Sequence, residues 1–406
     1  MNAPITLKPD QRSEMAVSWP AVLACFMAAV FGWGFGFTGL SVYLANLRQL
    51  HGWPTSLISA AITLYYLAGA VCLTQVHAVI RRVGPARMLA GGIVLLGGGA
   101  SWFGRALRPW EMFAAALVMA AGWACCTSTA IATSLALYFQ RQRGLAITLA
   151  LNGASAAGFT VAPALAALSL MLGLRTAVPL AAVVALAIVL PLIGIAFPAR
   201  TRLPIPAPAP GAADGAVAMG TLLRGWRFWS IALPFALALA AQVGIIVHLV
   251  SMLLPALGPG GSAFALALTS VAAMSGRLVL AGVIDRLPQR PAAAISITSQ
   301  AVGLGMMWLF LDQPAVLYAG CVLFGLSVGN VITFPALIVQ REFPIAAFAK
   351  VVGLSAAAGQ FTFALSPALL GLIHDSAGSY RPVLVLCIAF QLTASVLVLR
   401  RPRAGV

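Results

Sequence analysis

The stretch AAMSGRLVLAG, residues 272–282, contains one charged residue, Arg277, among apolar and small side chains. A guanidinium group stays protonated in proteins and presents a planar fork of N–H donors that matches the two oxygens of a carboxylate. No Asp or Glu occurs within seven residues of Arg277 on either side. This pattern predicts that Arg277 binds a carboxylate that the protein itself does not supply. The alternative is a structural arginine satisfied by helix-end carbonyl groups.

Neutral polar side chains within other apolar segments are further candidates for substrate binding. A buried polar group needs a hydrogen-bond partner, so each of them either contacts substrate or bridges two helices. The candidates are Asn152, Gln242, Asn330, Thr333, Gln360 and Tyr66.

His248, in the apolar stretch GIIVHLV, is a candidate proton site. An imidazole titrates near neutral pH, so it can carry a proton or bond to substrate. The alternative is a histidine whose ring is satisfied by a neighbouring helix. His51, His77 and His374 lie near predicted loops, and we expect them to face solvent.

Signatures of other chemistry are missing from the sequence. There is no phosphate-binding GxxxxGK[ST] loop, no nucleophile elbow, and no His, Cys and carboxylate cluster with metal-ligand spacing. The six cysteines all fall in apolar segments, where they are interpreted as small packing residues. We therefore expect neither an enzyme nor a protein that needs a cofactor or metal.

Composition places the candidate residues in a membrane protein. Of the 406 residues 61% are hydrophobic and only 8% are charged, whereas a soluble domain carries about 25% charged residues. The formal net charge of +16 comes from basic residues scattered singly between apolar segments. That scatter is typical of loop charges that set membrane topology, and it argues against nucleic-acid binding.

Twelve segments are long enough to cross a bilayer, which takes about 20 apolar residues. The predicted fold class is therefore an all-α membrane protein with twelve transmembrane helices. The segments are approximately 19–47, 54–78, 87–105, 110–138, 144–170, 176–197, 226–254, 262–284, 291–311, 314–340, 350–373 and 381–400. Arg277, eight residues before Asp285 at one end of its segment, then lies roughly 12 Å into the membrane.

Loop charges predict the orientation. An even number of segments puts both termini on the same side of the membrane. The loops on that side carry most of the Lys and Arg residues. We therefore expect a protein of the cell inner (plasma) membrane with both termini in the cytoplasm. The Pro-rich stretch 198–225 is too polar to cross lipid and reads as a linker. The predicted organisation is a tail (1–18), a six-helix half (19–197), the linker (198–225), a second six-helix half (226–400) and a short tail (401–406).

The two halves resemble each other. NGASAAGFTVAPALAAL begins at Asn152 and VGLSAAAGQFTFALSPALLGL begins at Val352, and both contain Gly-x-Ser-Ala-Ala followed by a Pro-Ala-Leu. The loops RRVGPARML and IDRLPQRPA match more loosely. Two pseudo-symmetric six-helix repeats around a central site are the plan of a secondary transporter.

These segments resemble the major facilitator superfamily and, within it, the group of monocarboxylate transporters and oxalate/formate antiporters. The local matches are YFQRQRGLAITLALNGASAAG from Tyr138, GRLVLAGVIDR from Gly276 and LSPALLGLIHDSAGSY from Leu365. The resemblance implies the major facilitator fold, alternating access, and an arginine at the place of Arg277 that binds the substrate carboxylate. It also implies gating loops, which here carry Arg82, Gly84, Arg87, Asp285 and Arg286.

The sequence departs from this family at positions linked to charge. Arg81 stands where the loop after the second segment usually has an acid, so the usual charge latch of the N-terminal half is not expected. Ala273 stands where proton-coupled relatives often have an aspartate one turn before the arginine, and FGWGFGFTGLSVYL has no lysine. Carboxylate recognition is thus retained without known parts of the proton relay.

The sequence as a whole predicts a transporter of small organic anions, most of all monocarboxylates, that works by alternating access. Its partners are the anion, the lipid bilayer, and either protons or a counter-anion. One alternative is a carboxylate/carboxylate antiporter without proton coupling. The other is a ligand sensor that uses the transporter fold.

Overall fold

Helices make up all the regular structure in the described part of the chain, which is residues 14–139, 142–197, 222–223 and 225–400 of a computed structural model. Most of the predicted tails and linker (1–13, 198–221, 224 and 401–406) lies outside these residues. The helices are α1 (Glu14–Trp33), the π-helix η1 (Gly34–Thr38), α2 (Gly39–His51), α3 (Thr55–Leu73), α4 (Val76–Arg105), α5 (Pro109–Cys126), α6 (Ser128–Leu135), α7 (Arg143–Leu172), α8 (Leu174–Ala196), α10 (Trp226–Val283), the 3-10 helix η2 (Ile284–Arg286), α11 (Gln289–Leu309), α12 (Pro314–Val331), α13 (Phe334–Glu342), α14 (Ile345–Ala377) and α15 (Arg381–Leu399).

Eleven of the described helical stretches are long and apolar enough to cross a membrane. One of them, Trp226–Leu280 in α10, has 55 residues, which would measure roughly 80 Å as a straight helix and far exceeds a bilayer core of about 30 Å. It is two crossings that meet at Gly258, whose φ of 67° and ψ of 178° lie outside the helical region. The described chain therefore has twelve crossings, and the predicted fold class is confirmed.

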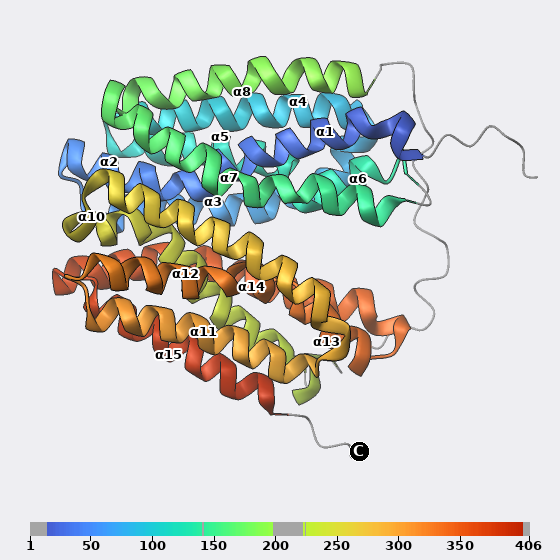
Figure 1. The fold of residues 1–406 in the computed structure, drawn as a ribbon. Coiled ribbons are helices and arrows are strands. Elements are labelled where there is room, and N and C mark those ends of the chain that lie inside the picture. The colour runs from blue at the N-terminus through green and yellow to red at the C-terminus, as the bar shows by residue number, and fades with distance from the viewer. Residues whose placement is uncertain (1–13, 140–141, 198–221, 224, 401–406) are drawn as a thin grey trace, which may run out of the picture.

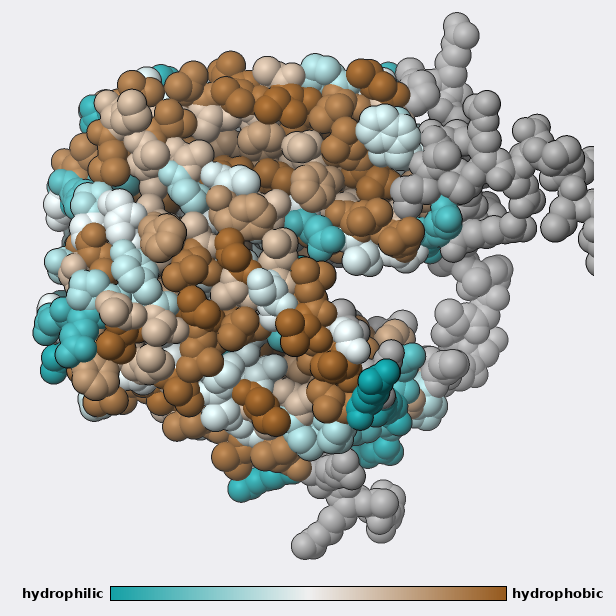
Figure 2. Space-filling model, in the orientation of Figure 1, coloured by the Kyte–Doolittle hydropathy of each residue, from teal (hydrophilic) through white to brown (hydrophobic). Residues whose placement is uncertain are grey.

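The crossings form two bundles (Figure 1). Helices α1 to α8 make the N-terminal bundle, in the upper half of the view, and α10 to α15 make the C-terminal bundle below it. The bundles separate at the end where α6 and α13 lie, which we call the open end. They meet at the opposite end, near the junction of α2 and α3, which we call the closed end. Figure 2 shows the gap at the open end and a continuous surface at the closed end.

Glycine permits the close approach of helices where the bundles meet. A Cβ atom added to Gly158 of α7 would collide with the side chain of Ser270 in the second crossing of α10. Within the C-terminal bundle, a Cβ on Gly276 would likewise collide with the backbone of Leu326 in α12. Lipid tails are as apolar as the side chains of membrane helices, so the hydrophobic effect does not drive these helices together. Van der Waals contact at such close approaches contributes to their association instead.

Arg290 connects the helices at the open end of the C-terminal bundle. Its guanidinium donates to both Glu342 carboxylate oxygens (2.6 and 2.8 Å), to the Val398 carbonyl (2.8 Å) and to the Ser230 hydroxyl (3.0 Å). Arg290 is only 3% exposed, and the contacts join α11 to α13, α15 and α10. The neighbouring Arg286, predicted to act in this loop, is exposed. The Asp285 side chain lies outside the described part of the structure.

We expect Glu342→Ala to destabilise the protein because it leaves the Arg290 charge buried without its carboxylate. The loss should be about 2 kcal/mol, less than the roughly 3–5 kcal/mol for a fully buried pair, because Glu342 is partly exposed. The measurement is the thermal unfolding temperature in detergent, with Arg286→Ala as the control from the same loop. Equal unfolding temperatures for the two variants would contradict this account of Arg290.

Candidate functional site

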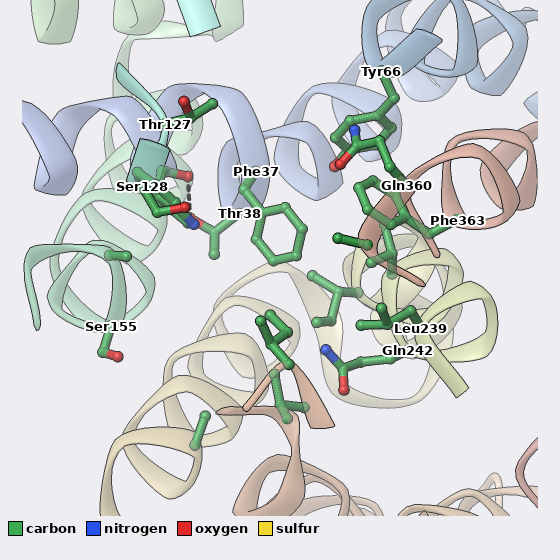
Figure 3. Close-up of a pocket in the computed structure, with 18 of the residues that line it drawn as sticks. Phe37, Thr38, Tyr66, Thr127, Ser128, Ser155, Leu239, Gln242, Gln360 and Phe363 are labelled. Atoms are coloured by element: carbon green, nitrogen blue, oxygen red, sulfur yellow. Dashed lines mark hydrogen bonds between the residues drawn. The ribbon is translucent and has the colours of Figure 1, made fainter. Parts of the chain in front are cut away.

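A cavity of about 420 Å³ lies between the two bundles. Among the residues that line it, the N-terminal bundle contributes Trp33, Phe37, Thr38, Tyr66, Trp123 and Ser155, and the C-terminal bundle contributes Gln242, Ser270, Arg277, Ser355, Gln360 and Phe363. Figure 3 shows side chains of both bundles facing this space. Its volume falls in the range of small-molecule sites, which is about 300–1,000 Å³.

Arg277 reaches the cavity from the second crossing of α10. Its Nη1 donates a hydrogen bond of 3.1 Å to the Ser155 hydroxyl of α7, so the contact joins the two bundles. The guanidinium lies over Gly329 of α12, where an added Cβ would stand 2.8 Å from Nε and 3.0 Å from Nη2. A glycine at position 329 thus makes the room in which the guanidinium lies.

Arg277 is the only lining residue that carries a charge at neutral pH among those the structure describes. The contacts Arg290–Glu342 and His374–Asp375 both lie elsewhere. A lone cation in a low-dielectric cavity produces a positive potential that attracts anions. Ala273, one turn before Arg277, also lines the cavity and adds no countercharge.

Tyr66 and Gln360 add polar groups from opposite bundles (Figure 3). The Tyr66 hydroxyl is buried and has no hydrogen-bond partner among the described residues. Its ring packs edge-to-face on Phe363 with centroids 5.5 Å apart. A buried unpaired hydroxyl costs free energy, so a ligand that bonds to Tyr66 would recover it.

Three predicted binding residues are not among the described residues that line the cavity: Asn152, Asn330 and Thr333. The Asn330 amide donates to the Leu326 carbonyl of its own helix (3.1 Å), and the Thr333 hydroxyl is 3.5 Å from the Gly329 carbonyl. The structure therefore brings Arg277, Gln242, Gln360 and Tyr66 together, and leaves the other three outside.

Ser155 is a cavity residue that the sequence analysis did not single out. It is the serine of the first Gly-x-Ser-Ala-Ala repeat, and Ser355, the serine of the second, also lines the cavity. The Ser355 hydroxyl is buried with no partner among the described residues. The signal was thus present as a polar residue at the same place in both repeats.

His248 lies outside the cavity lining, fully buried toward the closed end. Its Nε2 is 3.1 Å from the Pro367 carbonyl, which can only accept, so Nε2 carries the hydrogen and Nδ1 accepts from the Tyr380 hydroxyl at 3.2 Å. Burial raises the pKa of Tyr380, which keeps that hydroxyl protonated. Ser59 of the N-terminal bundle is 3.3 Å from Nε2, so neutral His248 links the two bundles.

Asp375 seals the closed end. Its carboxylate accepts from the backbone N–H groups of Thr55 (3.2 Å) and Ser56 (2.7 Å), which begin α3 in the other bundle. Unpaired N–H groups and a positive dipole end make a helix N-terminus a favourable place for an anion. His374 lies 3.0 Å from Asp375 and 3.4 Å from Arg48. The expectation that His374 faces solvent is wrong, because this contact buries it.

The predicted gating residues of the N-terminal bundle lie at the open end. Gly84 interrupts α4 with a φ of 84°, a conformation that favours glycine, just before Pro85. Arg82 and Arg87 on either side of this break are exposed. Their gating role stays a prediction.

Two helical bundles around a central cavity that contains a single charge among its described lining residues, closed at one end and open at the other, define a membrane transporter. The model of the Major Facilitator Superfamily matches residues 22–367, and the chain belongs to this family. Mouse monocarboxylate transporter 11 is 28% identical over 344 residues, which cover 79% of this chain and 72% of that protein.

Two crystal structures of nucleoside transporter NupG have the same fold. A mutant form gives a TM-score of 0.77 at 12% identity, covering 93% of this chain and 98% of the other. A second structure gives 0.69 at 14% identity, covering 95% and 98%. At these identities the likeness concerns the fold alone.

We expect Gly371→Val to open the closed end. A Cβ at position 371 of α14 would lie 2.9 Å from the Cα of Ser56 and 3.0 Å from the Cβ of Ser59, so the larger side chain must push α3 away. In a cysteine-free background, a Thr55→Cys reporter, buried at the closed end, should react faster with a membrane-impermeant maleimide when Gly371 is replaced.

Gly353→Val is the matched control, because a Cβ at position 353 of the same helix would meet no atom within 4 Å. Unchanged labelling in the Gly371→Val protein, with labelling of the control at the same rate, would contradict the role of this contact.

Proposed function

We propose that the protein transports small organic anions, most of all monocarboxylates, and that Arg277 binds the carboxylate. The observation that carries the proposal is the lone guanidinium in the cavity between the bundles, held by Ser155 and facing no carboxylate of the described chain. A charge so placed is costly unless an anion or water compensates it. The similarity to a monocarboxylate transporter supports the same cargo class.

The proposed mechanism is alternating access. In alternating access the central cavity opens first to one side of the membrane and then to the other. A structure that is open at one end and sealed at the other is consistent with one of these two states (Figure 2). The cargo would enter or leave through the open end, and contacts such as that of Asp375 with α3 would break when the other end opens. In this proposal the protein lies in the inner (plasma) membrane with both termini and the open end on the cytoplasmic side.

Exchange of one carboxylate for another is a second candidate, favoured by a specific observation. None of the described cavity residues is an acid, a lysine or a histidine, and Ala273 stands one turn from Arg277. A proton symporter needs a group that gains and loses a proton near the cargo. Counterflow in proteoliposomes, with and without a pH gradient, distinguishes the two modes.

We expect Arg277→Ala to abolish carboxylate transport while the protein still inserts and folds. Arg277→Lys should restore little, because an ammonium lacks the bidentate fork. Uptake into proteoliposomes and the thermal shift of the purified protein with a panel of carboxylates measure transport and binding separately. Normal uptake by the Arg277→Ala protein would overturn the assignment of the site.

Gly329→Ala should impair transport because the added methyl group would crowd the Arg277 guanidinium and the Ala273 carbonyl of α10. Its added methyl group would stand 2.8 Å from Nε and so push the guanidinium out of its place. We expect carboxylate affinity to fall about tenfold, which corresponds to about 1.4 kcal/mol. Gly353→Ala makes the same change in an open position of α14 and should bind as the wild type does. Equal affinities for the two variants would contradict the steric role of Gly329.

A further inference from the structure

Three glutamines form a continuous chain of hydrogen bonds inside the C-terminal bundle. Gln391 of α15 donates through Nε2 to the Gln300 side-chain oxygen (2.8 Å), and Gln300 of α11 donates through Nε2 to the Gln242 oxygen (2.9 Å). Each of these side chains is at most 1% exposed. Gln242, in the first crossing of α10, is the one member of the chain that lines the cavity.

The direction of the chain is fixed at its far end. Gln391 Nε2 also lies 3.2 Å from the Ala238 carbonyl, which can only accept a hydrogen bond. The amide group of Gln391 must therefore turn its nitrogen to this side, and its two hydrogens serve Ala238 and Gln300. Gln300 then accepts through its oxygen and donates through its nitrogen, so Gln242 can only accept from it.

Gln242 is left with a free amide nitrogen. Its oxygen is taken by Gln300, and Nε2 has no hydrogen-bond partner among the described residues. Figure 3 shows the Gln242 nitrogen on the side of Phe37 and the oxygen turned away from it. The chain therefore presents N–H donors, and not an acceptor, to the cavity that contains the Arg277 charge.

We propose that Gln300 and Gln391 are positioning residues that hold the Gln242 amide as a donor to the cargo. The inference rests on the proposed function and makes it more specific. With Arg277 binding the carboxylate, Gln242 binds a second hydrogen-bond acceptor, so the site prefers a short carboxylate with an oxo group to the unsubstituted acid. If the chain were reversed, the Gln242 oxygen would face both the anion and this acceptor and would repel them.

The test compares two three-carbon acids, pyruvate and propionate, which differ by an oxo group. The wild-type protein should bind pyruvate about three- to tenfold more tightly, the value of one hydrogen bond. Gln300→Met interrupts the chain at similar volume. It should bring the affinity ratio close to one while it changes propionate affinity less than twofold. Gln313→Met, at an exposed position before α12, is the control and should keep the wild-type ratio.

Gln300→Glu tests the direction of the hydrogen-bond chain through the pH dependence of the pyruvate preference. A purely structural role of Gln300 would not make this preference depend on pH. A protonated carboxyl donates to Gln242 and accepts from Gln391, so the chain keeps its direction. An ionised carboxylate only accepts and forces Gln242 to turn its nitrogen away from the cavity. The pyruvate preference of this variant should therefore fall as pH rises, relative to the wild type measured at each pH. Gln391→Leu, which removes the fixed end, serves as a second variant should Gln300→Met fail to fold.

The outcomes separate the two proposals. If the wild type binds neither acid, the proposed function fails and this inference fails with it. If the wild type binds both acids equally, or prefers pyruvate equally in the folded Gln300 and Gln391 variants, only the role of the glutamine chain is overturned. A pH-independent ratio in Gln300→Glu equal to that of the wild type would overturn it as well.

Discussion

The positive charge of Arg277 is the constraint on which the other features of the cavity depend. An arginine cannot lose its proton to escape a low dielectric, so its surroundings must supply compensation. Within the described chain these surroundings offer one hydroxyl, from Ser155, and the space over Gly329. Arg277 also lines the cavity between the bundles, and no acid is among the described residues that line it. A buried cation without a countercharge is stabilised when an anion or water comes close to it.

The contacts that seal the closed end are weaker than the Arg290 contacts inside the C-terminal bundle. Asp375 bonds to two backbone N–H groups at the start of α3 and to no basic side chain of the other bundle. A carboxylate at a helix N-terminus contributes only about 0.3–1 kcal/mol when exposed. His248 joins the bundles through one contact, with the Ser59 hydroxyl. Differential binding of a cargo to two states can outweigh contacts of this size.

Sequence reasoning succeeded where the signal was local. A single charge in an apolar stretch drew attention to Arg277, which lines the cavity, and the segment lengths and repeats indicated the twelve-helix fold. Gln242 was visible as a polar residue in a span, but its connection to Gln300 and Gln391 appears only in three dimensions. Gln300 lies 58 residues after Gln242 in the sequence, and Gln391 lies 91 residues after Gln300. The solvent exposure of His374 was misjudged because a position near a loop in the sequence does not reveal the opposing bundle that buries it.

Asn330 and Thr333 illustrate the complementary limit. A polar residue in a span can bond to its own helix backbone as readily as to a ligand, and both residues lie near carbonyls one turn earlier. The Asn330 side-chain oxygen has no partner among the described residues. The face that Asn330 occupies depends on how α12 packs, and the glycines of α12 decide that packing through close backbone contact. Composition and spacing could therefore name candidates there without separating cavity residues from neighbours.

The distribution of polar contacts between the bundles also has a mechanical consequence. In the C-terminal bundle, Arg290 of α11 makes several charge-assisted bonds to three other helices, and the glutamine chain joins three helices. Across the bundles, Arg277 has a single bond to Ser155. A network of several hydrogen bonds resists deformation more than a single bond does. The C-terminal bundle, with Arg277 and Gln242, should therefore move as one body, while the interface with the N-terminal bundle yields.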